Sequence, residues 1–239
     1  MGNNLNIVTS NEHNNLSRLE RRLDVSAIYA QFSATEPIVL WQEIKHSDHH
    51  ADLDAAVPAG TQHLFPTLPI PITVPKWYSV MKQFSVRTKE NTAAQFETGK
   101  VERYYAAALL RDTTRPNLPA FWVINTHFTN GCDWENKDAT DNDVNSFLRP
   151  YWLDHWDLLQ AEILKIRAAG QTSFYGGDFN RQVSPPFHST EKLAVGNGRI
   201  DKLAVIDRSV ATALKATGMI ETYSDHQAQW ARWELTVQT

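Results

Sequence analysis

Cysteine is almost absent from this sequence, since Cys132 is the one cysteine among 239 residues. An intramolecular disulfide is therefore excluded, and a domain of this length does not need one to fold. Long apolar runs are absent too, because no stretch approaches the roughly 20 apolar residues of a membrane-spanning helix. The polar N-terminus has no apolar segment of the signal-peptide type. We therefore expect no membrane span and a cytoplasmic location.

An excess of positive charge is also missing. The chain carries 23 lysine and arginine residues against 27 aspartate and glutamate residues, which gives a formal net charge of −4. The strongly basic balance typical of nucleic-acid-binding proteins is thus not found. Nucleic acid is not excluded as a substrate, because a bound cation can bring its own positive charge to a phosphate group.

Bulky apolar side chains, in contrast, are plentiful. Hydrophobic residues make up 42% of the chain, and eight Trp and ten Phe supply material for a large core. This composition is typical of a globular protein and unlike that of a disordered chain. Neither an internal repeat nor a linker is evident, so we expect residues 1–239 to form a single domain and favour a monomer.

The first predicted elements indicate a layered α/β fold. Residues 5–10 and 38–41 are short apolar runs typical of buried strands, and a helix is predicted over residues 14–32. The apolar residues of this helix recur at spacings of three and four: Leu16, Leu19, Leu23 and Ala27. We expect this face to pack on a sheet. A strand, a helix and a strand in this order favour α/β layers.

The rest of the chain is predicted to add strands and one long helix. Five prolines make residues 57–75 irregular, with edge strands at most. Further strands are expected at residues 78–86, 104–110, 120–126, 171–175, 200–206 and 230–237. A polar, acidic loop is expected at 130–145, and a helix over 147–169 ends at Gly170. One face of that helix is apolar: Leu148, Trp152, Leu159, Ile163 and Ile166.

Polar groups collect at the ends of the predicted strands. The segments are Ser10–Asn11, Gln42–Glu43, Asn125–His127, Gly177–Asn180 and, further along, Ser224–His226. In α/β layers, functional groups gather where strands end. Most of these side chains offer oxygen, which suits a hard cation such as Mg²⁺ or Mn²⁺ better than zinc. The two histidines of these segments, His127 and His226, are available for proton transfer or for contact with a phosphate oxygen.

Each segment also has a purely structural explanation. Gln42–Glu43 or Asn125–His127 alone is most often a polar strand end, and Ser224–His226 alone fits a helix cap. Gly177–Asn180 fits a turn held by hydrogen bonds from its Asp and Asn side chains. Because all these segments occur together, each at a predicted strand end, we favour a shared site.

The ordered motifs resemble those of the endonuclease/exonuclease/phosphatase family. The matching positions are Asn11, Gln42–Glu43, Asn125–His127, Gly177–Asn180, Asp201 and Ser224–His226. Arg199–Lys202 also resembles the Arg-Ile-Asp-Tyr segment of the family, with Lys202 where an aromatic residue is usual. The resemblance implies an α/β fold, a four-layered α/β/β/α sandwich with two packed mixed β-sheets.

The resemblance also implies a metal site and the roles of individual residues. Glu43 is expected to be the principal Mg²⁺ ligand, with help from Asn11 and Asp225 and with Mn²⁺ as an alternative ion. His226 is expected to act as a general base or as a phosphate contact, with Asp201 accepting its other ring proton. The remaining expected roles are water and phosphate positioning by Asp178 and Asn180, a phosphate contact by His127, and weaker phosphate contacts by Lys45 and Asn125.

Several alternatives stay open. Members of the family carry a Tyr or a second Glu before the Asn-Thr-His strand, and the sequence does not choose among Tyr104, Tyr105, Glu102 and Glu97. The leading functional hypothesis is Mg²⁺-dependent hydrolysis of phosphodiester bonds in DNA or RNA. The alternatives are a phosphatase or phosphodiesterase acting on small phosphorylated metabolites or lipid headgroups, and a non-catalytic binding module with the same fold.

The histidine-rich run His46–Asp52 invites a second metal interpretation. His46 and His50 are four residues apart, as two zinc ligands on one helix face would be. A cysteine or a third ligand at suitable spacing is not evident. We therefore favour a solvated helix start that is capped by Ser47 or Asp48.

Overall fold

Two mixed β-sheets of six strands each pack face to face in this computed structural model, which describes residues 4–13, 15–32, 35–88, 103–129, 149–181, 185–196 and 201–238. The first sheet contains, in spatial order, β11 (Val210–Ile220), β12 (Ala228–Val237), β1 (Asn4–Asn11), β2 (Ile38–Gln42), β4 (Ile72–Val74) and β3 (Gln62–Leu64). The second contains β5 (Tyr78–Arg87), β6 (Tyr104–Asp112), β7 (Phe121–His127), β8 (Ser173–Asp178), β10 (Asp201–Ile206) and β9 (Glu191–Val195).

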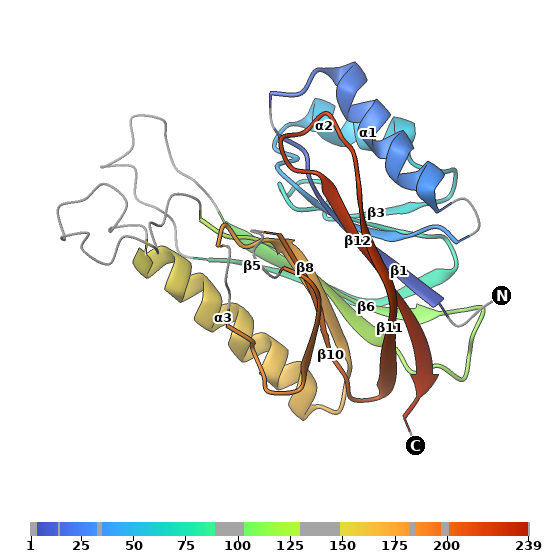
Figure 1. Cartoon of the computed structure of the whole chain (residues 1–239), viewed down its shortest axis with the longest axis vertical. Coiled ribbons are helices and arrows are strands. Elements are labelled where there is room, and N and C mark those ends of the chain that lie inside the picture. Colours follow the sequence, from blue (N-terminus) through green and yellow to red (C-terminus); the bar gives the residue numbers. More distant parts are fainter. Residues whose placement is uncertain are drawn as a thin grey trace.

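Helices cover the two outer faces. The helices α1 (Arg18–Gln31) and α2 (Ser47–Ala56) lie on the first sheet, and α3 (Arg149–Ala168) lies on the second (Figure 1). One apolar cluster fills the space between the sheets, with Ile7, Leu40, Val123 and Phe174 among its members. Two further clusters lie under α3 and under α1. The predicted four-layered α/β/β/α sandwich is therefore confirmed.

The apolar face predicted for α1 is wrong. Leu19 is 67% exposed and Leu23 is 43% exposed, whereas the helix buries Arg21, Asp24, Val25, Ile28 and Tyr29. Two of these buried residues are charged and find partners elsewhere in the fold. Arg21 pairs with Asp52 of α2, and Asp24 accepts a hydrogen bond from the backbone N–H of Tyr223. The periodicity of leucines cannot reveal such partners.

The start of each N-terminal helix also differs from the prediction. Helix α1 begins at Arg18, because Ser17 and Glu20 form a capping box. Helix α2 begins at Ser47 with His46 as its N-cap, and neither Ser47 nor Asp48 supplies the predicted cap. The expectation of a solvated start holds for positions 46–48 but not for His49 and His50, which are buried.

Helix α3 agrees with its prediction. It spans Arg149–Ala168 and buries Trp152, Leu159, Ile163 and Ile166, as the apolar periodicity indicates. Gly170 follows it with a φ of 76°, the left-handed conformation that glycine adopts at helix ends. Leu148 and the loop expected at 130–145 lie outside the described residues. No helix in the described part of the chain is long and apolar enough to cross a membrane.

Two strands were not predicted, and one was placed wrongly. Strand β9 is an edge strand without a buried residue, and β11 shows no continuous alternation of buried and exposed residues. Their sequences therefore lack the pattern of a half-buried strand. Strand β4 lies between β2 and β3 rather than at an edge.

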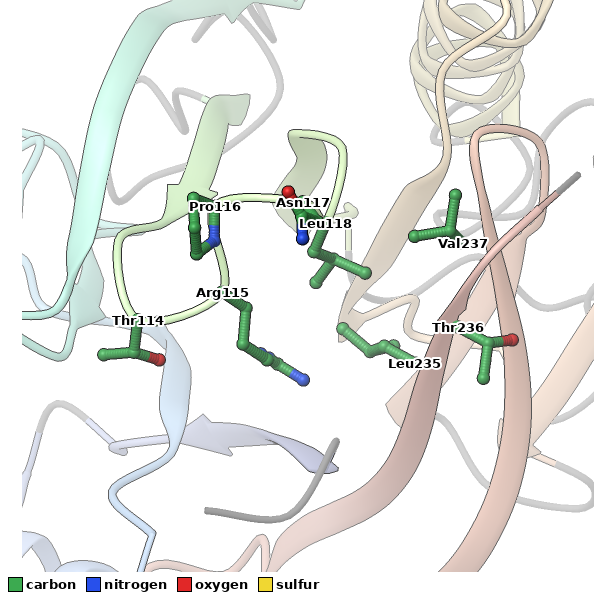
Figure 2. Close-up of a pocket in the computed structure, with 8 residues that line it drawn as sticks. All are labelled: Thr114, Arg115, Pro116, Asn117, Leu118, Leu235, Thr236 and Val237. Atoms are coloured by element: carbon green, nitrogen blue, oxygen red, sulfur yellow. The ribbon is translucent and has the colours of Figure 1, made fainter.

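A surface hollow of about 430 Å³ lies between the β6–β7 turn and the end of β12 (Figure 2). Its lining residues are Thr114, Arg115, Pro116, Asn117, Leu118, Leu235, Thr236 and Val237. Because Asn4 of β1 pairs with Glu234, this hollow is near the N-terminal end of β1. The polar segments singled out in the sequence are at the opposite end of these strands.

Candidate active site

The polar ends of five strands meet at one edge of the sandwich. Parallel pairing aligns Asn11 of β1 with Gln42 of β2 in the first sheet. Parallel pairing likewise aligns His127 of β7 with Asp178 of β8 in the second sheet. Strand β10 runs antiparallel to β8, so its first residue, Asp201, lies beside Asp178. The topology therefore brings together residues that are far apart in the sequence.

Asn11 connects the two sheets at this edge. Its Nδ2 donates a hydrogen bond to Oδ2 of Asp178 at 3.0 Å, and both residues are buried. Its Oδ1 is also buried and has no hydrogen-bond partner among the described residues. A buried amide oxygen without a partner is costly, which is consistent with an oxygen that accepts a ligand.

Asp178, Asp201 and His226 form a compact cluster. One ligand atom from each of the three lies within 4.8 Å of the other two. The distance from His226 Nδ1 to Asp201 Oδ2 is 3.4 Å. Chiefly through this contact with Asp201, the pKa of His226 is raised to about 9, and Asp178 and Asp225 contribute further. Burial, followed by the neighbouring Asp201 carboxylate, raises the pKa of Asp178 well above its ordinary value.

His127 lies on the other side of Asp178. Its Nε2 is 3.7 Å from Asp178 Oδ2, and its ring is buried. Burial lowers the pKa of His127 well below its ordinary value, and the nearby Arg103 and Lys45 lower it further. The ring is therefore neutral at physiological pH and keeps one N–H to donate.

The turn after β8 fixes the carboxylate of Asp178. The backbone N–H of Asn180 donates to Asp178 Oδ1 at 2.7 Å, and Asn180 has a φ of 50°. Its side-chain Nδ2 donates to the backbone oxygen of Phe128 at 3.0 Å. Gly177 has a φ of 138°, and a Cβ there would stand 1.9 Å from the oxygen of Thr126. Only glycine fits where these parallel strands end.

Glu43 follows β2 in a left-handed turn. Its φ is 64°, which is unusual for a residue other than glycine. The side chain is 16% exposed, and its Oε2 lies 3.1 Å from the ammonium group of Lys45. Lys45 itself is exposed. The main chain of Glu43 is next to Asn11, since the N–H of Glu12 donates to the oxygen of Gln42.

The loop Ser224–His226 is fastened to β1 and α1. The hydroxyl of Ser224 donates to the backbone oxygen of Asn11 at 2.5 Å. The buried carboxylate of Asp24 accepts the N–H of Tyr223 at 2.8 Å. Asp225 is exposed, and the structure does not bring it into the cluster of Asp178, Asp201 and His226.

Arg103 is a functional candidate that the sequence reasoning missed. Its Nε is buried and has no hydrogen-bond partner within the described part of the chain. Burial lowers the pKa of Arg103, while the charges of Glu43 and Asp178 raise it. The guanidinium therefore lies close enough to both carboxylates to interact with their charges. A basic residue directly before the strand that pairs with β7 was the signal in the sequence.

Asn125 has a structural role, which corrects the expectation of a phosphate contact. Its Nδ2 donates to the backbone oxygens of Trp41, Ile70 and Pro71 at 2.7, 3.2 and 3.0 Å. Its Oδ1 accepts a hydrogen bond from Gln42 at 2.7 Å. These bonds join the two sheets and leave no group of the amide free for phosphate.

The structure also separates the two tyrosines. Tyr105 belongs to the apolar cluster under α3 and packs on His155 there, away from the candidate site. Successive residues of a strand point to opposite faces, so Tyr104 lies on the face turned away from α3. Tyr104 is thus the better candidate of the two. Glu97 and Glu102 lie outside the described residues.

The donor set fits a hard divalent cation. Asn11 Oδ1 and Asp201 Oδ1 are buried oxygens with no hydrogen-bond partner among the residues described. Glu43, whose main chain lies next to Asn11, adds a carboxylate to the set, and no cysteine is described near them. Oxygen donors of this kind suit Mg²⁺ or Mn²⁺.

Similar solved structures have the same fold. A Bacteroides thetaiotaomicron protein of the endonuclease/exonuclease/phosphatase family is 14% identical, with a TM-score of 0.66 over 96% of this chain and 94% of the other. A mannosyl-6-phosphatase of the same species is 13% identical, with a TM-score of 0.66 over 97% and 99%. D. rerio TDP2 complexed with a single-strand DNA product is 12% identical, with a TM-score of 0.66 over 96% and 98%.

The sequence comparisons give no match. No protein-family profile matches the sequence, and no curated protein is significantly similar to it. At identities this low, the structural likeness shows the fold alone. By that likeness and by its own two-sheet topology, the chain has the fold of the endonuclease/exonuclease/phosphatase family.

Proposed function

We propose that this protein is a divalent-metal-dependent hydrolase of phosphoric esters, and foremost a nuclease that cleaves phosphodiester bonds in DNA or RNA. The observation that supports this most is the cluster of buried Asp178 and Asp201 with half-buried His226, in which Asn11 bonds to Asp178. Two carboxylates and a histidine at one edge of the sandwich can supply the proton transfers and the water positioning that hydrolysis of a phosphate ester needs. The fold shared with a phosphatase and with a DNA-bound enzyme agrees with it.

Glu43 and Asn11 would hold the cation, with Asp225 as the expected third oxygen donor. The free Oδ1 of Asn11 supports this assignment. Bound Mg²⁺ supplies positive charge that stabilises the non-bridging phosphate oxygens. Lys45 lies 3.1 Å from Glu43 and would release that carboxylate to the cation and contact phosphate instead.

The side chains of the cluster then divide the proton transfers. Asp178, oriented by Asn11 and by the turn at Asn180, positions a water and accepts its proton as the water oxygen bonds to phosphorus. The bond from phosphorus to the leaving oxygen breaks in the same step. His226, held by Asp201, contacts the phosphate and gives a proton to the leaving oxygen. The protons lost and gained balance.

Two further groups would bind the phosphate. Neutral His127 has a ring N–H for a non-bridging oxygen, and it lies 3.7 Å from Asp178. Arg103 has a buried, unsatisfied Nε close to Glu43 and Asp178. A guanidinium binds phosphate through several donors at fixed geometry. Arg103 is thus the proposed anchor of the phosphate.

A panel of substrates tests the proposal. Supercoiled DNA, single-stranded DNA, RNA, bis-p-nitrophenyl phosphate and p-nitrophenyl phosphate are each incubated with Mg²⁺ and with EDTA. A nuclease cleaves one or more of the nucleic acids, stops with EDTA, and slows as salt rises because phosphate contacts release counterions. His226→Ala should lower turnover by at least about 100-fold, since general acid–base help contributes about 10²–10⁴-fold.

The controls separate chemistry from folding. His188→Ala changes a histidine of an exposed loop whose ring bonds only to the nearby Thr190 among the described residues, and it should leave turnover unchanged. If inorganic phosphate is released from monoesters while nucleic acids stay intact, the protein is instead a phosphatase acting on small phosphate esters. If no ester is hydrolysed, the hydrolase assignment is wrong, and a binding module with this fold replaces it.

A further inference from the structure

Histidines gather on α2 and β3, outside the candidate active site. The sequence pairs His46 with His50 by their spacing, but the structure does not. The ring of His46 packs edge-on against His49, with 4.8 Å between the ring centroids and an interplanar angle of 86°. The partner of His50 is His63, which lies on β3.

The two rings present nitrogens to each other. His50 Nδ1 and His63 Nε2 are 3.3 Å apart, and the ring centroids are 5.2 Å apart. On the far side of His63, Nδ1 lies 2.6 Å from Oδ1 of Asp54. The carboxylate of Asp54 accepts a hydrogen bond from the Nδ1–H of His63, and this fixes the tautomer of the neutral ring. The lone pair of His63 Nε2 therefore points at His50.

The separation of the two nitrogens matches that of two ligands on one metal ion. Two imidazole nitrogens that each lie about 2.0–2.1 Å from a tetrahedral zinc ion are about 3.3–3.4 Å apart. The observed separation of 3.3 Å lies within this range. A histidine ligand whose other ring nitrogen donates to a carboxylate is the usual arrangement at protein metal sites.

We propose that His50 and His63 form a binding site for a first-row transition metal ion, Zn²⁺ above all, in which Asp54 orients His63 and water completes the coordination. In the metal-free protein, the Nδ1–H of neutral His50 donates to Nε2 of His63. Binding of the ion at both nitrogens requires His50 to carry its hydrogen on Nε2 instead, so the ring changes tautomer and no net proton is released. The carboxylate of Asp54 stays on His63 throughout.

The surroundings of His50 favour its neutral form. His50 is buried, and burial together with the neighbouring His63 lowers the pKa of His50 to about 4. His50 therefore keeps its lone pair at physiological pH. Imidazole nitrogen suits zinc, copper and nickel, whereas Mg²⁺ prefers oxygen. This site and the proposed catalytic site thus select different ions, and either proposal can fail without the other.

The site would connect two parts of the first sheet layer. His50 and Asp54 are one turn apart on α2, which follows the segment that carries Glu43. His63 pairs with Thr73 of β4, and β4 pairs with β2. An ion held by both elements would fasten α2 to the β3 edge. Because it would bind the folded chain only, it should raise the unfolding temperature.

Competition with a chromophoric zinc chelator tests the site in the full chain, with Mg²⁺ in excess to occupy oxygen-rich sites. Zinc should bind the unmodified protein with micromolar or better affinity. His50→Gln and His63→Gln should each weaken it at least tenfold, and Asp54→Asn about 10–100-fold, as expected for a residue that orients a ligand. His188→Gln is the matched control and should bind zinc as the unmodified protein does.

A second readout does not depend on affinity. Zinc should shift the ring nitrogen resonances of His50 and His63 and raise the unfolding temperature of the unmodified protein, but not of His63→Gln. Circular dichroism checks that each variant is folded, and His50→Gln tests the same site independently. If the two glutamine variants bind zinc as tightly as the unmodified chain, or these resonances do not move, the pair merely shares a proton and the proposal is overturned.

Discussion

Asn11 donates a hydrogen bond to Asp178 at 3.0 Å, although the two residues are 167 positions apart in the chain. Asn11 ends β1 of the first sheet and Asp178 ends β8 of the second. The bond therefore crosses between the sheets at the edge where the candidate site lies. The position of the Asp178 carboxylate depends on how the two sheets pack, and this dependence makes Asp178 the sharpest residue to test.

Asp178→Asn should abolish most activity without unfolding the protein. We expect turnover to fall at least about 100-fold, because a group that transfers a proton contributes about 10²–10⁴-fold. Burial and the neighbouring Asp201 disfavour a charge at position 178, so a neutral amide should not lower the unfolding temperature. The side-chain amide of Asn11 can rotate by half a turn, so that its Oδ1 accepts a hydrogen bond from the N–H that asparagine introduces at position 178.

Initial rates with Mg²⁺ and thermal unfolding measure the two effects. Asp157→Asn removes an exposed carboxylate of α3 and should change neither of them. If Asp178→Asn retained near-normal rates, the carboxylate would have no part in the chemistry. If its activity loss came with an unfolding temperature many degrees lower, the loss would instead reflect damage to the fold.

Arg103→Met should weaken catalysis through phosphate binding. A hydrogen bond to a charged group is worth about 1.5–3 kcal/mol, which corresponds to roughly 10–150-fold in kcat/KM. Arg103→Lys should recover only part of this loss, because an ammonium keeps the charge but not the planar fork of donors. The loss should also reduce the dependence of the rate on salt.

Steady-state rates at several salt concentrations measure this prediction. Arg111→Met is the control, since Arg111 lies on β6, the strand that Arg103 precedes, and has an exposed side chain. Equal kcat/KM values for Arg103→Met and Arg111→Met would rule out a role for Arg103 in binding the phosphate.

Much of the fold was predictable because it depends on local patterns. Continuous apolar runs such as Ile38–Trp41 are strands buried on both faces, and the C-terminal end of each carries a polar group. The face of α1 was not predictable, because Arg21 and Asp24 are buried by partners distant in the sequence, Asp52 and Tyr223. Apolar periodicity has no access to such pairs.

The candidate site likewise contains residues that sequence motifs predict and residues whose roles depend on distant partners. Motif order predicted Asp178, Asp201 and His226, and the topology brings the three together. The sequence could not distinguish Asn125, which looks like a ligand but uses its whole amide to join the sheets. Arg103 was missed because a single basic residue before a strand resembles any polar strand end. Its importance appears only from the burial of Nε and its nearness to the carboxylates.

Lys202 stands where the family usually has an aromatic residue, and its surroundings explain how a lysine is accommodated. The ammonium lies 2.8 Å from Glu191, and both side chains are buried. It also lies 5.3 to 5.8 Å from the ring centroids of four aromatic residues: Trp156, Tyr175, Phe179 and Phe187. A buried ion pair inside an aromatic cage therefore stands in place of an aromatic ring.

Lys202→Met should destabilise the fold strongly because it leaves Glu191 buried without its cation. Removing one member of a buried pair costs about 3–5 kcal/mol, and replacing both often costs little. Lys202→Met combined with Glu191→Gln should thus recover most of the loss in urea unfolding. Lys165→Met, which breaks an exposed pair with Glu162 on α3, should cost under about 1 kcal/mol. A double variant no more stable than Lys202→Met would contradict this account.

His155 should make the protein less stable in acid. Its ring is buried, bonds to Thr126 at 2.8 Å and stacks on Phe128 at 4.1 Å between centroids. Burial, helped by Arg103, lowers the pKa of His155 from 6.5 to about 3. Between these values the unfolded chain binds a proton that the folded chain does not. Its contribution to stability is therefore complete above about pH 6.5 and is lost as pH falls towards 3.

The pH dependence of the free energy of unfolding measures the contribution of His155. One such group makes the free energy of unfolding fall by at most about 1.4 kcal/mol per pH unit. His155→Gln removes the group, so its free energy of unfolding should vary with pH less steeply, by about 1 kcal/mol per unit between pH 6 and 4. Urea unfolding at a series of pH values gives both slopes, with His188→Gln, a change in an exposed loop, as the control. If the free energy of unfolding varied with pH equally steeply in His155→Gln and in the unmodified chain, the prediction would be wrong. The ring of His155 would then be protonated in the folded protein as readily as in the unfolded one.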